Sequence, residues 1–280
     1  MFPIRDNNPT SSMAYVTIIL IAFNALIFLS EAWGPVDQSH FTWKYGFVPA
    51  ELEEPADAFE EGIHQHPPLQ QARDRLGRPL INLRTRQPLL VPDTEAIESA
   101  TAIPAWVNIF TCMFLHGGWW HLIGNMLFLW IFGNNIEDRL GPWLFLVFYL
   151  GTGVCGNLAH SLFDSGLGFT PLVGASGAIS GVMGAYILLF PKARILAVVP
   201  IGWYPATFSL PAWIYLLFYI GIQNLYPAYF SYGGSHVAYW AHIGGFSAGM
   251  AMILVFPQVK RERPPAPVHD PREDDADFVL

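Results

Sequence analysis

Charge is what this sequence has least of. Asp, Glu, Lys and Arg make up 13% of its 280 residues, whereas soluble domains carry about 25%. Hydrophobic residues account for 52% and aromatic residues for 15%, so the composition excludes an ordinary soluble domain and predicts a protein of the lipid bilayer. The formal net charge is −8 and no basic stripe could hold phosphates, which excludes nucleic acid as a partner.

Cysteine is almost absent. Cys112 and Cys155 both lie in apolar segments, where a thiol behaves as a small buried hydrophobe. They indicate no disulfide framework and are not site candidates. His64 and His66, in a polar loop, are too few for a metal site. We therefore expect no metal and no cofactor.

Six apolar stretches are long enough to cross a hydrocarbon core of about 30 Å. They cover residues 13–33, 105–134, 142–162, 175–191, 207–223 and 237–257. We predict an all-α membrane protein, a bundle of six transmembrane helices. The first stretch is expected to remain as a span, because Glu31-Ala32-Trp33-Gly34 offers no signal-peptidase site after it.

The other segments are polar or interrupted by proline and glycine. Residues 1–12 are predicted to be a cytoplasmic tail, 258–280 a disordered cytoplasmic tail, and 195–204 an interfacial connector. The six-span domain covers 13–257, and its long first outer loop contains a polar insertion at 51–100.

That first loop divides into two parts. Residues 41–49 are aromatic and are expected to rest on the bilayer surface. The insertion that follows is rich in Pro, Arg and Glu, and its residues 80–85 and 88–91 are expected to pair as a short hairpin.

Lys and Arg in the short loops set the expected orientation. Segments 163–174 and 224–236 contain neither residue and are assigned to the outer side. The opposite side collects Arg5, Arg139, Lys192, Arg194, Lys260, Arg261, Arg263 and Arg272. Both termini are predicted to be cytoplasmic. A six-span core without an organelle-targeting extension indicates a bacterial or archaeal cell membrane.

Four polar residues stand near the starts of even-numbered stretches, which all run in the same direction. His121 and Asn125 share one face of the second stretch, Ser176 opens the fourth, and His242 lies about five residues into the sixth. At 1.5 Å per residue, each lies about 10 Å or less below its helix start. Ionisable residues inside a membrane are rare and costly, so they indicate a functional site.

Small residues are expected to bring the fourth and sixth stretches together through small-x-x-x-small surfaces. These residues are Gly177, Gly181, Gly184, Gly245 and Gly249. Close approach would place Ser176 within hydrogen-bond reach of His242, which is the first requirement for general-base catalysis.

The pattern predicts peptide-bond hydrolysis. Ser176 would act as nucleophile and His242 as general base, and the same histidine would protonate the leaving amine. The backbone N–H of Ser176 and the side chains of His121 and Asn125 would stabilise the oxyanion. No Asp or Glu lies near His242 in the sequence, so we expect a dyad without a carboxylate that orients the histidine.

Each of these residues alone has a commoner explanation. A single Ser in a membrane helix usually packs or bonds to backbone, a single His often bonds a neighbouring helix, and Gly-x-x-x-Gly is frequent in bundles. Their matched depth on three parallel helices favours catalysis. A transporter would need internal repeats and charged groups on several spans, and the sequence shows neither.

The chain resembles the rhomboid family of intramembrane serine proteases over nearly all of 13–257 outside the insertion. The similar motifs are Phe114-Leu115-His116-Gly117-Gly118-Trp119-Trp120-His121-Leu122-Ile123-Gly124-Asn125, Gly174-Ala175-Ser176-Gly177 and Ala241-His242-Ile243-Gly244-Gly245. The resemblance implies the same roles for Ser176, His242, His121 and Asn125 as the chemistry does.

Other positions carry over differently. His116 matches a structural histidine of the family, and Glu137 with Arg139 matches a signature for which we expect a structural hydrogen-bonding role. Some members carry an aromatic residue four positions after the nucleophile, stacked on the catalytic histidine. This chain has Ser180 there, so another group is expected to support His242.

The resemblance also implies a transmembrane protein substrate, cut near or within its span where the helix can unwind, with a small side chain before the scissile bond. Entry is expected to need movement of the fifth stretch or of residues 226–235. The rival within the family is a catalytically inactive client-binding protein, against which the retention of all four site residues counts. The natural substrate and the oligomeric state do not follow from the sequence.

Overall fold

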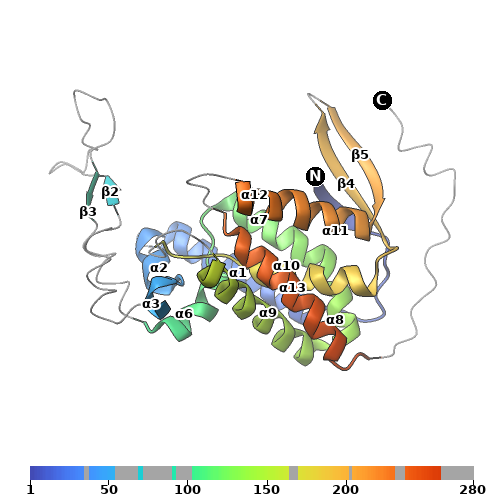
Figure 1. Cartoon of the computed structure of the whole chain (residues 1–280), viewed down its shortest axis with the longest axis horizontal. Coiled ribbons are helices and arrows are strands. Elements are labelled where there is room, and N and C mark those ends of the chain that lie inside the picture. Colours follow the sequence, from blue (N-terminus) through green and yellow to red (C-terminus); the bar gives the residue numbers. More distant parts are fainter. Residues whose placement is uncertain are drawn as a thin grey trace.

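The computed structural model describes residues 1–34, 38–53, 69–71, 90–92, 103–163, 170–201, 204–230 and 237–259. Their helices form a bundle, and a small sheet stands at one end of it (Figure 1). The predicted insertion lies outside the described residues except at 51–53, 69–71 and 90–92, and so do His64, His66 and residues 260–280.

Six helical stretches of the described chain build the bundle. The helices α1 (Tyr15–Trp33) and α9 (Pro142–Phe163) are long and apolar enough, by length and composition, to cross a membrane, whereas α10 (Ser176–Leu189) and α13 (Tyr239–Val255) are apolar but shorter. The other two stretches are composite. One joins α7 (Trp119–Phe128), the π-helical turn η2 (Leu129–Gly133) and α8 (Asn134–Leu140), and the other joins α11 (Ala212–Ile220), the π-helical turn η3 (Gly221–Leu225) and α12 (Tyr226–Phe230).

Shorter elements accompany the bundle. They are α2 (Gln38–Tyr45), α3 (Ala50–Glu53), and α6 (Ala105–Thr111) with the 3-10 turn η1 (Cys112–Phe114). Of the hairpin expected between 80–85 and 88–91, only 90–91 are described. They belong to β3 (Leu90–Pro92), which pairs with β2 (Leu69–Gln71).

Two predicted spans were wrong at their starts. The stretch 105–134 is not one helix. The helical segment that begins at Ala105 ends at Phe114, and a new helix begins at Trp119. Gly117 and Gly118 lie between them, and glycine is a poor helix former. The fifth helix begins at Ala212 rather than at 207, because the chain up to Pro211 belongs to a strand.

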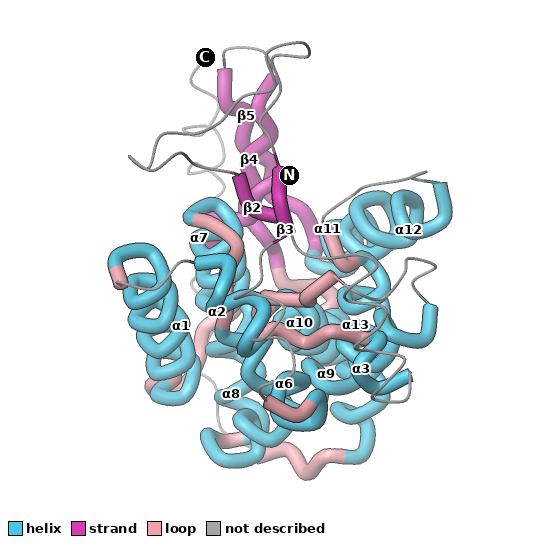
Figure 2. The backbone as a smooth tube through the Cα atoms, turned by 90° about the vertical axis from the view of Figure 1, so that its left-hand side faces the viewer, coloured by secondary structure: helices cyan, strands magenta, loops and turns pink. Residues whose placement is uncertain are grey.

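The fold is mostly helical, as predicted, but it is not all-α. The strands β1 (Phe2–Asp6), β4 (Arg194–Ile201) and β5 (Tyr204–Pro211) form an antiparallel sheet in the order β1-β4-β5, and β4 and β5 stand away from the helices (Figure 2). Residues 2–6 had been assigned to a tail and 195–204 to a connector. Burial alternates along the start of β4, as expected of a strand with one covered face: Ile195 and Ala197 are fully buried while Arg194 is exposed.

The helix α8 anchors the N-terminal segment at this sheet end of the bundle. The carboxylate of Glu137 accepts hydrogen bonds from the backbone N–H groups of Val16 and Thr17, at 2.9 and 2.8 Å, and from the Thr17 hydroxyl at 2.8 Å. It therefore caps the start of α1, where backbone N–H groups lack helical partners. Asp138 accepts from the hydroxyl of Ser12 at 2.6 Å. The hydrogen-bonding role expected for Glu137 matches these contacts.

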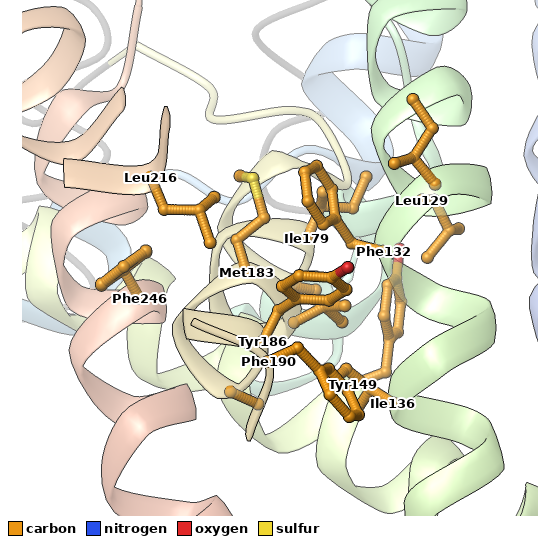
Figure 3. Packing of buried hydrophobic residues seen from close by; sticks show 14 of the residues in the cluster. Leu129, Phe132, Ile136, Tyr149, Ile179, Met183, Tyr186, Phe190, Leu216 and Phe246 are labelled. Atoms are coloured by element: carbon orange, nitrogen blue, oxygen red, sulfur yellow. The ribbon is translucent and has the colours of Figure 1, made fainter. Parts of the chain in front are cut away.

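The helix α10 forms the centre of the bundle. Every residue from Gly177 to Tyr186 is buried, and its side chains face those of the surrounding helices (Figure 3). The ring of Tyr186 packs edge-on against Phe132, with 5.0 Å between centroids, and the hydroxyl of Tyr186 donates to Asp6 of β1 at 2.5 Å. The central helix is thus held by packing along its length and by the N-terminal strand at its far end.

Glycines let the backbones of α10 and α13 touch. A Cβ added at Gly245 would lie 2.0 Å from the carbonyl oxygen of Gly177, and one added at Gly249 would lie 1.9 Å from that of Gly181. No side chain fits in either place, so the small-x-x-x-small prediction is confirmed for this pair of helices.

Substituting Gly249 by Ala should destabilise the protein by about 1–3 kcal/mol, because a methyl group would have to push apart two helix backbones that cannot yield locally. The free energy of unfolding in detergent measures this loss. Gly124→Ala is the matched control, since a Cβ there meets nothing within 4 Å, and it should leave stability equal or higher. Equal effects at the two positions would contradict the contact.

The carboxyl of Glu51, outside the bundle helices, makes the free energy of unfolding depend on pH. Burial raises its pKa from 4.5 to about 7, and a hydrogen bond from the backbone N–H of Ala105 opposes this rise only in part. Below pH 4.5 the group is protonated in both the folded and the unfolded chain. As the pH rises toward 7, the unfolded chain loses its proton first, so folded stability declines.

The variant Glu51→Gln removes this titration. Between about pH 4.5 and pH 7.5 the thermal midpoint of the wild-type protein should fall relative to that of the variant. Parallel midpoint curves for the two proteins would show that Glu51 titrates normally.

Candidate active site

The first two residues of the site lie on the helices that the glycines bring together. Ser176 is the first residue of α10, and His242 lies in the first turn of α13. The Oγ of Ser176 is 2.7 Å from the Nε2 of His242. Both side chains are half-buried. The geometry is that of a hydroxyl donating its proton toward an imidazole nitrogen.

The other imidazole nitrogen has a partner as well. The Nδ1 of His242 lies 2.6 Å from the Oδ1 of Asn224, in the π-helical turn η3. The Nδ2 of Asn224 donates to the carbonyl oxygen of Tyr219 at 2.8 Å. Nδ1 of His242 thus faces an amide oxygen.

An aromatic ring lies near His242 despite the small residue at position 180. The ring of Tyr219, on α11, is tilted by 32° relative to the imidazole, with 6.4 Å between centroids. Its hydroxyl is 2.6 Å from the Oγ of Ser180, which is fully buried. In this chain the fifth helix places an aromatic ring near the imidazole, where some members of the family have one from the fourth helix.

His121 and Asn125 approach the same place from α7. A Cβ added at Gly174 would lie 2.8 Å from the imidazole of His121 and 3.7 Å from the Nδ2 of Asn125. Gly174 also has φ +125°, which L-residues with a side chain rarely adopt. A glycine two residues before Ser176 is what allows the α7 side chains to approach the start of α10.

Asn125 is fixed by its neighbour His116. The Nδ2 of Asn125 donates to the Nε2 of His116 at 3.1 Å, and both side chains are buried. An amide nitrogen carries two hydrogens, so this bond leaves a second N–H of Asn125 for another acceptor. His116 supports a candidate oxyanion donor, in line with the structural role expected of it.

Three contributors escaped the sequence analysis. The predicted fifth span ended at residue 223, one position before Asn224, and Tyr219 appeared to be an ordinary aromatic residue of an apolar helix. Glu31 lies near the end of α1 and is 4% exposed, and its carboxylate accepts a hydrogen bond from the backbone N–H of His116. A search for single polar residues within each apolar stretch would have found Glu31, and one extended a few residues past the end of each stretch would also have found Asn224.

No group of three or more His, Cys, Asp or Glu side chains that could hold a metal ion occurs among the described residues. The atoms gathered near Ser176 are instead a hydroxyl, an imidazole and N–H donors, including the unpaired N–H groups of the first turn of α10. Such a set can form and stabilise a tetrahedral adduct at a carbonyl carbon.

Comparison with known proteins identifies the family. Residues 104–259, more than half of the chain, match the Rhomboid domain. The chain belongs to the rhomboid family. The resemblance noted from the three motifs is confirmed, and the family implies a helical membrane fold.

Three similar rhomboid proteins illustrate the range of the family. The chain is 31% identical over 194 residues to RHOMBOID-like protein 1 of Arabidopsis thaliana, covering 65% of this chain and 44% of that protein. It is 33% identical over 149 residues to Rhomboid protein 1, mitochondrial, of Saccharomyces cerevisiae, covering 51% and 40%. It is 36% identical over 97 residues to Rhomboid protease GluP of Bacillus subtilis, covering 35% and 18%. This rhomboid chain thus matches less than half the length of each of the three.

Proposed function

We propose that this protein is an intramembrane serine endopeptidase that cleaves transmembrane proteins near or within their membrane spans. The observation that carries the proposal is the 2.7 Å contact between the Oγ of Ser176 and the Nε2 of His242 in a rhomboid chain. The name of one relative, a rhomboid protease from Bacillus subtilis, agrees with it.

The chemistry proceeds by acyl transfer. The Ser176 oxygen attacks the scissile carbonyl carbon as its proton passes to Nε2 of His242. The imidazolium then gives that proton to the amine that leaves as the C–N bond breaks. Water attacks the resulting ester with His242 again as base, which releases the second product and restores the serine hydroxyl.

The negative charge on the carbonyl oxygen needs hydrogen-bond donors during both steps. The backbone N–H of Ser176 and the second N–H of Asn125 are the donors we assign, with His121 beside Gly174 as a third. Ser176 and His121 lie in the first turns of α10 and α7, where the helix dipole also favours negative charge.

The substrate must be opened before it is cut, because the carbonyl groups of a helix are closed to attack and must be freed from their hydrogen bonds. We propose six membrane-crossing helices, with entry past the composite stretch 212–230 and a small residue before the scissile bond. Arg5, Arg139, Lys192 and Arg194 belong to the sheet end or the segments leading into it. This distribution supports a cytoplasmic sheet end and an outward-facing site. We propose the cell membrane as the location.

Replacing either Ser176 or His242 by Ala should abolish cleavage of tagged single-span substrates in liposomes, with a loss of at least about 10³-fold. A panel of substrates with helix-breaking residues in the span should be used. Undiminished cleavage in the variants would assign the activity to a contaminant. Intact substrates with a folded wild-type protein would favour a client-binding rhomboid-like protein instead.

Asn125→Ala should lower kcat by about 10²-fold with little change in KM, because the amide would act on the oxyanion and not on the bound substrate. Asn157→Ala is a suitable control, since that buried amide donates to the carbonyl oxygen of Ile109 at 2.9 Å and takes no part in the site. A rise in KM at constant kcat would count against an oxyanion role for Asn125.

A further inference from the structure

We propose that Asn224 is a positioning residue for His242, and that it makes assembly of the Ser176–His242 pair depend on the docked position of the fifth helical stretch, residues 212–230. This inference rests on the proposed peptidase function. Asn224 lies outside the three family motifs, and its proposed role is to orient His242 as the general base.

Asn224 is held in a single amide orientation. Its Nδ2 donates to the carbonyl oxygen of Tyr219 at 2.8 Å, and a carbonyl oxygen can only accept. The amide oxygen must therefore be the atom that faces His242. At 2% exposure, Asn224 meets little competition from water for either bond.

This orientation selects one tautomer of His242. Because Oδ1 of Asn224 can only accept, Nδ1 of His242 carries the hydrogen across the 2.6 Å contact. Nε2 is then left with a lone pair, and it faces the Oγ of Ser176 at 2.7 Å. A general base requires this tautomer, and an amide oxygen in place of a carboxylate supplies it without adding a charge to the bundle.

Hydrogen bonds connect α10, α13 and the fifth stretch in a closed circuit that is completed by the backbone of α10. From Ser176 the bonds run to His242, then to Asn224, then to the Tyr219 carbonyl, and the Tyr219 hydroxyl returns to Ser180 at 2.6 Å. Ser176 and Ser180 are one helical turn apart on α10. Two sites of the fifth stretch, at Tyr219 and Asn224, thus support the base.

The fifth stretch is the peripheral member of this circuit. In both views α11 and α12 lie on the outside of the bundle, with α10 inside (Figures 1 and 2). Its outward side is apolar and exposed, including Leu217, Ile222 and Leu225. In addition, η3 is a π-helical turn, a distortion found often at functional sites. Displacement of this stretch would remove the amide from His242 while leaving α10 and α13 packed together through their glycines.

The first experiment compares kcat and KM for a cleaved single-span substrate in liposomes. Asn224→Leu should lower kcat about 10- to 100-fold with KM changed less than about twofold, because the base loses its acceptor while the substrate contacts remain. Asn224→Asp keeps an acceptor of the same size for Nδ1 of His242 but loses the N–H that donates to the Tyr219 carbonyl, so it should recover part of the lost kcat. Asn224→Ser is a second test that is less demanding for folding, and its short side chain should give the same loss as Leu.

The matched control is Asn24→Leu. Asn24 is also fully buried and also donates to a carbonyl oxygen of its own helix, that of Leu20 at 2.7 Å, but it lies on α1 away from His242. Its kcat should equal that of the wild type. Equal losses in Asn24→Leu and Asn224→Leu, or no recovery in Asn224→Asp, would show a merely structural role for Asn224.

The link to α10 is tested by a double-mutant cycle. Ser180→Ala and Tyr219→Phe each remove one hydroxyl of the 2.6 Å contact, and each should lower kcat about 3- to 10-fold. The double variant should be no slower than the slower single one, because both changes break the same bond. Additive losses would overturn the proposed link.

Ser176→Ala separates the two hypotheses. If Ser176→Ala is inactive and Asn224→Leu has wild-type kcat, the positioning role fails while the peptidase function stands. If Ser176→Ala cleaves as fast as the wild type, the activity belongs to a contaminant and the proposed peptidase function fails for want of any activity of its own.

Discussion

The contact on which the site depends is the meeting of two backbones. Between apolar helices in lipid there is no hydrophobic driving force, so association relies on close packing and hydrogen bonds. The glycines of α10 and α13 bring main-chain atoms together without side chains between them. That approach sets the distance between the first turns of the two helices, and therefore the distance from Ser176 to His242.

A second constraint acts on every polar group in such a bundle. A buried polar side chain without a partner is costly, and the described site follows this rule: Ser176, His242, Asn224, Tyr219 and Ser180 form one run of contacts. Asn125 pairs with His116 in the same way. Mutual satisfaction of these groups also orients them, so the bonds that make the polar residues tolerable in the bundle prepare the geometry that catalysis would need.

Much of this arrangement followed from the order of residues. The motifs around His121, Ser176 and His242 indicated the family, and the glycine spacing predicted which helices touch. The errors have physical causes. The strand 194–201 is as apolar as a helix and is interrupted by proline, so composition could not reveal its pairing with β1. The break before Trp119 depends on Gly117 and Gly118, which a hydropathy window averages away.

Composition indicated the membrane class, and helical spacing indicated the candidate nucleophile, the candidate base and the helix faces that pack. The three motifs indicated the family through their resemblance to it. The groups that contact Nδ1 and the ring of His242 became known from the fold alone. Asn224 and Tyr219 lie 18 and 23 residues before it in the chain, on a helix whose rotation and position are set by packing against α10 and α13. No local pattern encodes which side of such a helix meets the imidazole.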